Sequence, residues 1–221
     1  MFKGPHLFCL KDHAPFKILF YYTCLMNELD PFIEHIQKRV TLSPAELAEL
    51  VAAFKPKHIK KKQLIIQPDF IAKHRTYVLQ GALRSYVIDH EGIDRTIQFA
   101  IEDWWISDTN SYIYQKPATM FVVALEDSVI LQIDYEAEQR LKQANHLFET
   151  FFRIGAERTA AFHQRRIITA LTRTAEERYS DFLETYPSVA QRLPQYAIAS
   201  YLGMTTEFLS KIRNHKVRKK S

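Results

Sequence analysis

The chain has 221 residues, of which 47% are hydrophobic, and a formal net charge of +5. This hydrophobic content can form a substantial core, which excludes a disordered chain, and the length allows one large domain or two small ones. No stretch approaches the ~18 consecutive apolar residues of a membrane span.

Residues 1–25 differ from the rest of the chain. Residues 16–25 are apolar, but Lys17 interrupts them and no small-x-small cleavage site follows, as a secretory signal requires. We expect translation to start normally at Met26, so that residues 1–25 are an extension absent from the native protein, whose intact mass tests this. Cys9 and Cys24 are the only cysteines. They form no cluster for zinc or an iron–sulfur centre, so we expect no cofactor of that kind and a reducing, cytoplasmic location.

Two helices are predicted before the first strand. One follows Met26, where the sequence MNELDPFIEHI is amphipathic. The second begins at Ser43, whose side chain can cap it, while Pro44 suits the first helical position and Glu46 completes a capping box. The apolar face of this second helix is expected from Leu47, Leu50, Val51 and Phe54.

The apolar residues alternate with period two between about Lys57 and Asp134. This alternation predicts β-strands, and turn signals such as Asp89-His-Glu-Gly92 separate them. Several short strands at this spacing are typical of a sandwich or jelly roll. The predicted strands are residues 63–67, 77–79, 83–88, 95–99, 120–124 and 129–133.

A long helix of about thirty residues is predicted from Tyr135 onward. Its apolar and aromatic side chains exceed what one small domain easily covers, so we expect two copies to bury them in a homodimer. The alternative is that the helix packs on the β-domain alone. A capping box at Thr174-Ala-Glu-Glu177 begins a further helix, which ends near Pro187.

Two short helices joined by a tight turn fit the sequence QYAIASYLGMTTEFLSKIR, which begins at residue 195. Gly203 lies where the chain turns and tolerates a positive φ, and Ala199 is small where the helices cross. Thr205 and Thr206 can cap the second helix, with Glu207 in its first turn. The pattern predicts a helix-turn-helix, whose second helix enters a DNA major groove; a helical hairpin in an ordinary core is the alternative. The inward positions are Ile198, Leu202, Leu209 and Ile212.

The positive charge is concentrated at the C-terminus. Residues 192–221 contain seven Lys or Arg residues and one acid, so they carry +6 and the remaining 191 residues carry −1. This overlap with the predicted helix-turn-helix suits neutralisation of DNA phosphates, although a solvated basic tail is the alternative.

The order of β-roll, long helix and C-terminal helix-turn-helix resembles the Crp/Fnr family of bacterial transcription regulators. The resemblance extends over residues 26–213 and is most specific at TAEERY (174–179) and LPQYAIASYLG (193–203); it is also visible at 77–86 and 124–128. It implies an α+β fold with a cyclic-nucleotide-binding-like antiparallel β-roll of jelly-roll type, a dimerisation helix and a winged-helix-like domain. Residues 187–194 are few for a wing, which is reduced or absent. The implied divisions are an N-terminal extension (1–25), a sensor domain (26–134), a dimerisation helix (135–170) and a DNA-binding domain (171–221).

Matching the family's motif places the base-reading positions at Thr206, Glu207 and Lys211. Glu207 can accept a hydrogen bond from cytosine, Lys211 can donate to guanine, and Thr206 suits a base edge or a phosphate. Ser210 and Arg213 are expected to contact phosphates. As alternatives, Glu207 complements the helix dipole and Lys211 is a solvated surface charge. The predicted DNA-binding set is Thr205, Thr206, Glu207, Ser210, Lys211 and Arg213.

The sensor departs from the family members that bind cyclic AMP. These carry a Gly-Glu pair and, ten residues after that Glu, an Arg-Ser pair whose arginine meets the phosphate. The corresponding pairs here are Ser107-Asp108 and Ala118-Thr119. Because a buried phosphate then lacks its charge partner, we expect no response to cyclic AMP. No haem ligand can be assigned, so the effector is open. The nearby aromatic residues Trp104, Trp105, Tyr112 and Tyr114 are expected to be core.

Two other classes of protein fit the sequence less well than a DNA-binding regulator. A cupin-like metalloenzyme needs a His-x-His motif, whereas His58, His74 and His90 are isolated, and no nucleophilic or phosphate-loop motif occurs, so no enzyme is predicted. A protein-interaction module without DNA binding is favoured only by Phe208 on the second helix. The prediction is a homodimeric regulator on double-stranded DNA, with RNA polymerase as a further candidate partner. A signal in the β-roll is expected to shift the long helix.

Overall fold

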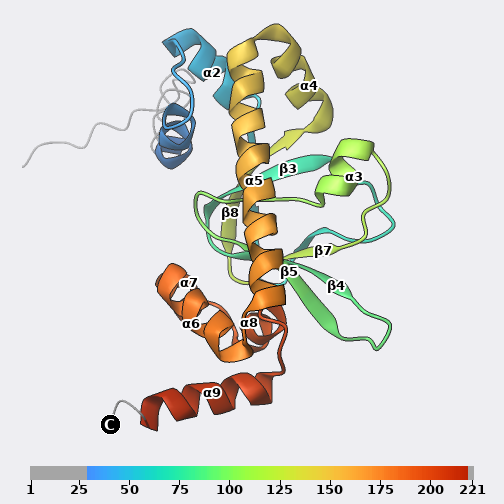
Figure 1. Ribbon diagram of the computed structural model, residues 1–221. Coiled ribbons are helices and arrows are strands. Elements are labelled where there is room, and N and C mark those ends of the chain that lie inside the picture. The colour runs from blue at the N-terminus through green and yellow to red at the C-terminus, as the bar shows by residue number, and fades with distance from the viewer. Residues whose placement is uncertain (1–28, 219–221) are drawn as a thin grey trace, which may run out of the picture.

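The computed structural model describes residues 29–218, and side chains as far as residue 215 (Figure 1). The predicted start at Met26 and the extension 1–25 lie outside these residues. Residues 29–37 are helical, and Phe32 and Ile36 are fully buried. Helix α2 (Pro44–Ala52) begins with the predicted capping box, in which the backbone N–H groups of Ser43 and Glu46 each donate to the other residue's side chain.

Two four-stranded antiparallel sheets form the predicted β-roll. The strand orders are β1-β8-β3-β6 and β2-β7-β4-β5. Apolar side chains from both sheets fill the space between them, among them Val78, Leu83, Val122 and Ile130. The strands are β1 (Lys55–Ile59), β2 (Leu64–Ile66), β3 (His74–Gln80), β4 (Leu83–Ile88), β5 (Asp94–Ala100), β6 (Trp105–Ile106), β7 (Phe121–Ala124) and β8 (Ser128–Asp134).

Three elements of the roll were not predicted. The first four residues of β1 are exposed and lack apolar alternation, so its pairing with β8 rather than its own sequence holds it. β6 has two residues, too few to show a period. Helix α3 (Thr109–Tyr114) begins at Asp108, whose carboxylate accepts from the backbone N–H of Ser111.

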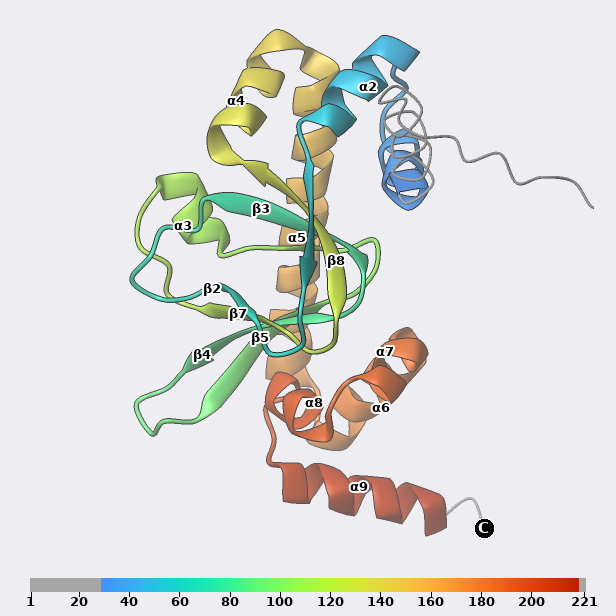
Figure 2. The ribbon, with the colours of Figure 1, turned by 180° about the vertical axis from the view of Figure 1, so that it is seen from behind.

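The helix predicted from Tyr135 is divided in two, α4 (Tyr135–Ala144) and α5 (His146–Thr172). Asn145 between them is extended, and its side-chain oxygen accepts from the N–H of Leu147, which caps α5. Its amide group donates to Glu46 in α2 at 2.7 Å. An asparagine that bonds the backbone in this way competes with a continuous helix. α5 then runs along the roll to the C-terminal helices (Figures 1 and 2).

Four helices follow α5: α6 (Ala175–Thr185), α7 (Pro187–Arg192), α8 (Gln195–Tyr201) and α9 (Thr206–Arg218). α6 begins with the predicted capping box between Thr174 and Glu177. One apolar cluster joins these helices and also includes Ala82 and Phe99 of the roll. Residues 135–218 contain no strand. The segment in which the sequence predicts a reduced or absent wing forms the helix α7 instead.

Candidate nucleic-acid interface

The turn between α8 and α9 has the geometry that the sequence predicted. Gly203 has a φ of +68°, in the left-handed region. The N–H of Met204 donates to the carbonyl of Ala199 at 3.0 Å, and that of Gly203 donates to Ser200 at 3.2 Å. These two bonds form a Schellman motif, which ends α8 and reverses the chain. The N–H of Phe208 donates to the Thr205 hydroxyl at 3.2 Å, so Thr205 caps α9.

The inward side of the pair is apolar, as predicted. Ile198, Leu202, Leu209 and Ile212 are all buried, and Ala199 is buried where α8 meets its neighbours. This packing leaves the opposite side of α9 in solvent.

The outer face of α9 carries Glu207, Lys211 and Asn214, which are all exposed. They follow one another at spacings of four and three residues, so they share one side of the helix. Asn214 is not among the residues predicted from the sequence, because the matched motif does not include it. Its signal was the seven-residue spacing from Glu207.

The other predicted positions lie on one flank of α9. Thr206 and Ser210 are half-buried, and Arg213 is exposed. The Ser210 hydroxyl donates to the Thr206 carbonyl at 2.9 Å, so its proton is used within the helix. Phe208 lies on the opposite flank and is 43% exposed.

The charges on α9 are available to a partner. Neither Glu207, Lys211 nor Arg213 makes an ion pair with another described residue. Arg192, which contributes to the basic C-terminal count, is different: it pairs with Glu102 at 2.7 Å and with Glu126. The C-terminal excess of positive charge that is left for a partner is therefore smaller than the sequence count.

The first helix of the pair, α8, is docked on the edge of the β-roll. β5 is the outer strand of its sheet, and Ile97 forms a bulge opposite Ser85 and Tyr86. The Ser200 hydroxyl accepts from the Thr96 N–H at 2.8 Å and donates to the Asp94 carbonyl at 2.6 Å. α8 thus satisfies backbone groups that the edge strand leaves unpaired.

Two arginines strengthen this docking. Arg166 of α5 donates to the carbonyls of Thr96 at 2.9 Å, of Tyr201 at 3.0 Å and of Ile97, so it ties α5, β5 and α8 together. The buried Arg84 donates to Thr96 at 2.8 Å, and its guanidinium lies over the ring of Tyr196 in α8. The position of the helix-turn-helix therefore depends on the roll.

Asp108 and Ala118, which the resemblance matches to the family's cyclic-nucleotide motif, are both buried in the roll. Asp108 is fully buried, and its carboxylate accepts from the N–H of Thr119 at 2.8 Å as well as from Ser111. Ala118 is buried in the apolar cluster of the roll. Ala118, which is buried, thus has a methyl group at the position matched to the arginine that a buried phosphate would need.

The four aromatic residues expected in the core near Asp108 differ in their contacts. Trp105 donates from its indole N–H to His35 at 3.0 Å, and Tyr112 donates to the buried Glu138 at 2.8 Å. Trp104 packs against aromatic rings of α5 and of the loop after α6. Tyr114 is 66% exposed, so the expectation of a core role is wrong for this residue.

The described residues hold no group of three or more His, Cys, Asp or Glu side chains that could bind a metal ion. His58 and His90 are exposed, and His74 is half-buried on β3. Within residues 29–218, no helix combines the length and hydropathy that crossing a membrane requires.

Comparison with known proteins gives a fold and no sequence relative. No family model and no curated protein matches the chain. Solved structures do match. FixK2 from Bradyrhizobium japonicum has a TM-score of 0.65 at 16% identity, over 75% of this chain and 85% of that one. A protein from Eubacterium rectale, assigned to the Crp/Fnr family of transcriptional regulators, has a TM-score of 0.63 at 18% identity, over 80% and 85%.

The chain has the Crp/Fnr fold. A variant of CooA from Carboxydothermus hydrogenoformans also shares it, with a TM-score of 0.62 at 17% identity, over 82% of this chain and 87% of that one. The matches span both the roll and the C-terminal helices, so the Crp/Fnr fold accounts for the order of elements predicted from the sequence.

Proposed function

We propose that this Crp/Fnr-fold chain is a sequence-specific DNA-binding regulator of transcription that acts as a homodimer. One observation carries the proposal: α9 follows a helix-turn-helix turn and holds an exposed polar face whose charges are unpaired among the described residues. A helix of this kind enters the major groove. The Eubacterium rectale protein, described as a transcriptional regulator, supports the same role.

The proposed contacts follow from the faces of α9. Glu207 accepts from a cytosine amine, Lys211 donates to guanine, and Asn214 bonds adenine, since these side chains point outward together. Thr206 and Arg213 lie on the flank, where a phosphate strand passes. Thr205 and Ser210 contact the DNA backbone nearby in this proposal. The structural role of Ser210 within α9 makes it the weakest of the set.

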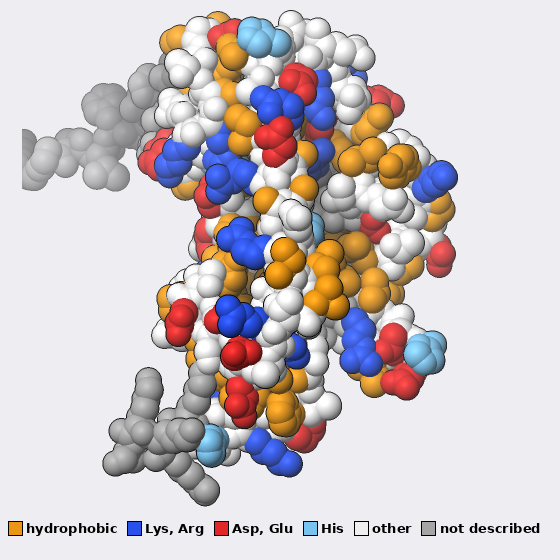
Figure 3. Space-filling model, in the orientation of Figure 1, with side chains coloured by type: hydrophobic (Ala, Val, Ile, Leu, Met, Phe, Trp, Pro, Cys, Tyr) orange, Lys and Arg blue, Asp and Glu red, His pale blue; other side chains and the backbone are white. Residues whose placement is uncertain are grey.

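The dimer is proposed from the C-terminal end of α5. Ile168 and Leu171 are 53% and 81% exposed there. Both hydrophobic and basic side chains lie over α5 on the face seen in Figure 3. A second copy of the helix would cover the apolar ones and would hold two α9 helices for half-sites about 34 Å apart.

The same proposal assigns residues 26–134 to a sensor, 135–170 to dimerisation and 171–221 to DNA binding. Because Ala118 is the residue matched to the family's phosphate-binding arginine, the sensor is proposed not to respond to cyclic AMP. No enzymatic activity and no resident cofactor are proposed.

Selection of bound DNA from a random pool by the purified chain tests the proposal. We expect one enriched, partly palindromic site whose footprint covers two half-sites. Lys211→Ala should relax preference at one base pair by about 1–3 kcal/mol, whereas Arg213→Ala should weaken binding to all sequences and reduce the salt slope by about 1. Lys116→Ala, an exposed change on the loop after α3, is the matched control. Equal affinity for selected and random DNA would refute the specific regulator.

A further inference from the structure

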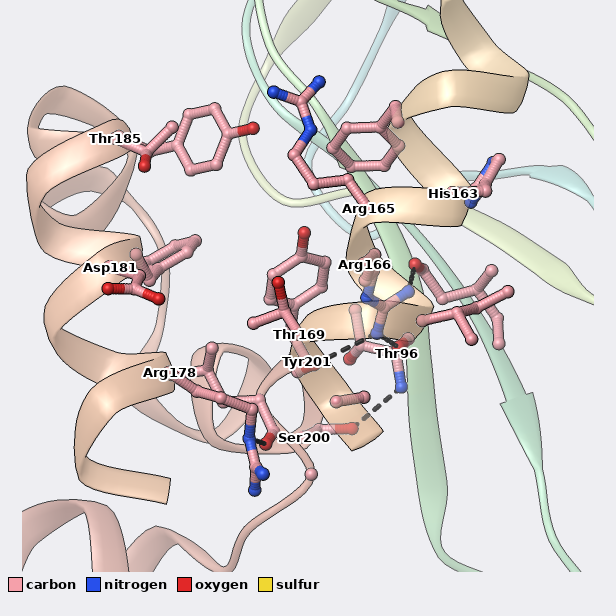
Figure 4. Close-up of a pocket in the computed structure, with 18 of the residues that line it drawn as sticks. Thr96, His163, Arg165, Arg166, Thr169, Arg178, Asp181, Thr185, Ser200 and Tyr201 are labelled. Carbon is pink, nitrogen blue, oxygen red and sulfur yellow. Dashed lines mark hydrogen bonds between the residues drawn. The ribbon is translucent and has the colours of Figure 1, made fainter. Parts of the chain in front are cut away.

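We propose that the cavity between α5, α6, α8 and β5 binds a small organic anion with an aromatic body, and that this anion is the effector. The cavity has a volume of about 700 Å³, within the range of ~300–1,000 Å³ for small-molecule sites. Figure 4 shows its two walls, with Arg165 and Arg166 on α5 and Arg178 and Asp181 on α6. The effector role rests on the proposed function; the binding itself does not.

The charge of the lining points to an anion. Four arginines line the cavity, and Asp181 is the one acid among the lining residues. Arg166 and Arg178 donate to backbone carbonyls rather than to carboxylates. Arg165 makes no ion pair with any described residue, whereas Arg95 pairs with Asp89 at 2.6 Å. Arg166 and Arg178 thus keep their charges beside the cavity with only carbonyl partners, and Arg165 has no acidic partner in the described chain. A guanidinium group without a carboxylate partner binds oxyanions well.

The apolar part of the lining points to an aromatic body. Phe162, Phe182, Tyr186 and Tyr201 line the cavity on three different elements and the loop after α6. Trp104 packs behind, with its ring 6.0 Å from Phe162 and 5.4 Å from Tyr186. Rings held in this way offer flat surfaces to a planar ligand.

A second copy of the chain fits the cavity less well. The end of α5 is the segment that a dimer would bring nearest, and residues 158–173 contain four arginines and no acid. Pairing of two α5 helices through Ile168 and Leu171 leaves the cavity open, since neither residue lines it. Inserting the arginine-rich segment into the cavity would instead place like charges against a basic lining, which costs free energy. Charge complementarity therefore favours a separate anion over the partner helix.

The position of the cavity links it to the helix-turn-helix. Ser200, Tyr201, Leu202 and Gly203 all line it, so a bound molecule touches the end of α8 and the turn before α9. The same residues include those that dock α8 on β5. A ligand that bridges α5 and α6 would thus bias how α9 is held, which is what an effector must do.

A fluorescence titration of the purified full chain with 1-anilinonaphthalene-8-sulfonate tests binding. The matched probe is N-phenyl-1-naphthylamine, which has the same rings and no charge. We expect one sulfonate per chain, bound at least about tenfold more tightly than the neutral probe. Arg165→Gln should weaken the sulfonate about fivefold or more and leave the neutral probe unchanged. Arg140→Gln, an exposed change on α4, should alter neither.

A second variant and a second measurement locate the site. Ala170→Trp fills the cavity and keeps every arginine, so both probes should be lost. Equal affinity for the two probes, or unchanged binding in Arg165→Gln or Ala170→Trp, overturns the proposal. So does dissociation of the dimer by the sulfonate in light scattering, because the cavity would then be the subunit interface.

Titrating the chain with the selected DNA site, with and without bound sulfonate, tests the effector role. We expect the affinity for the selected site to change at least about threefold. Specific binding of the sulfonate with unchanged DNA affinity would overturn the effector role and leave the regulator intact. If the chain binds the sulfonate but no specific DNA, the proposed function is refuted. The proposal that the cavity binds an anion is then unaffected.

Discussion

The docking of α8 on the roll makes a quantitative prediction for Ser200→Ala. The Ser200 hydroxyl accepts from the Thr96 N–H at 2.8 Å and donates to the Asp94 carbonyl at 2.6 Å. Thr96 is buried, so the substitution leaves its N–H without a partner, at a cost of about 1–3 kcal/mol. The lost bond to Asp94 adds about 0.5–1.5 kcal/mol, and the better helix propensity of alanine returns about 0.5 kcal/mol. The net expected loss in the free energy of unfolding is about 1–4 kcal/mol.

Urea denaturation measures this loss. Far-UV circular dichroism follows the helices, and the fluorescence of Trp104 and Trp105 follows the roll beside them. We expect the midpoint of Ser200→Ala to fall by both probes, while Ser188→Ala, an exposed change on α7, stays within about 0.5 kcal/mol of the unaltered chain. If Ser200→Ala also stays within that range, the two bonds do not hold α8 on the roll and the reasoning is refuted.

Two further predictions concern stability. Gly203→Ala should lower the free energy of unfolding by about 1–2 kcal/mol. The cost is conformational, because φ is +68° and an added Cβ would meet no atom within 4 Å. Calorimetry measures the loss, and an unchanged Tm would contradict the left-handed turn. Burial lowers the pKa of His35 below its ordinary 6.5, against the opposing bond to Asp103. Below about pH 6.5 the unfolded chain then binds the proton more readily, so stability should fall as the pH falls from 7 to 5. Urea midpoints should show a shallower pH slope in His35→Gln than in the unaltered chain, and equal slopes would show that His35 does not contribute.

Most of the Crp/Fnr fold could be predicted because its signals are local. The capping boxes at Ser43 and Thr174, and Gly203 at the turn, each encode a helix boundary within four residues. β1 could not be predicted from the sequence because its pairing with β8, and not an apolar alternation, stabilises it. The helix break at Asn145 could not be predicted because it involves a hydrogen bond to the distant Glu46. Such contacts leave no period in the sequence.

The candidate site was predictable in part for the same reason. The outward position of Glu207 and Lys211 follows from helical spacing, and Asn214 could have been added by extending that spacing. The salt bridges that remove Arg192 from the unpaired C-terminal charge join it to Glu102 and Glu126, which are remote in sequence. The cavity is assembled from β5, α5, α6 and α8, and no single segment contains its pattern.

The edge of β5 has a practical consequence for dividing the chain. Its free edge is covered by α8, and Phe99 and Ala82 beside it are buried in the cluster of the C-terminal helices. A fragment that ends before α6 would expose a strand edge together with apolar side chains, which is the usual template for intermolecular strand pairing. The isolated roll should therefore be prone to aggregate, and the C-terminal helices act as its solubilising cover.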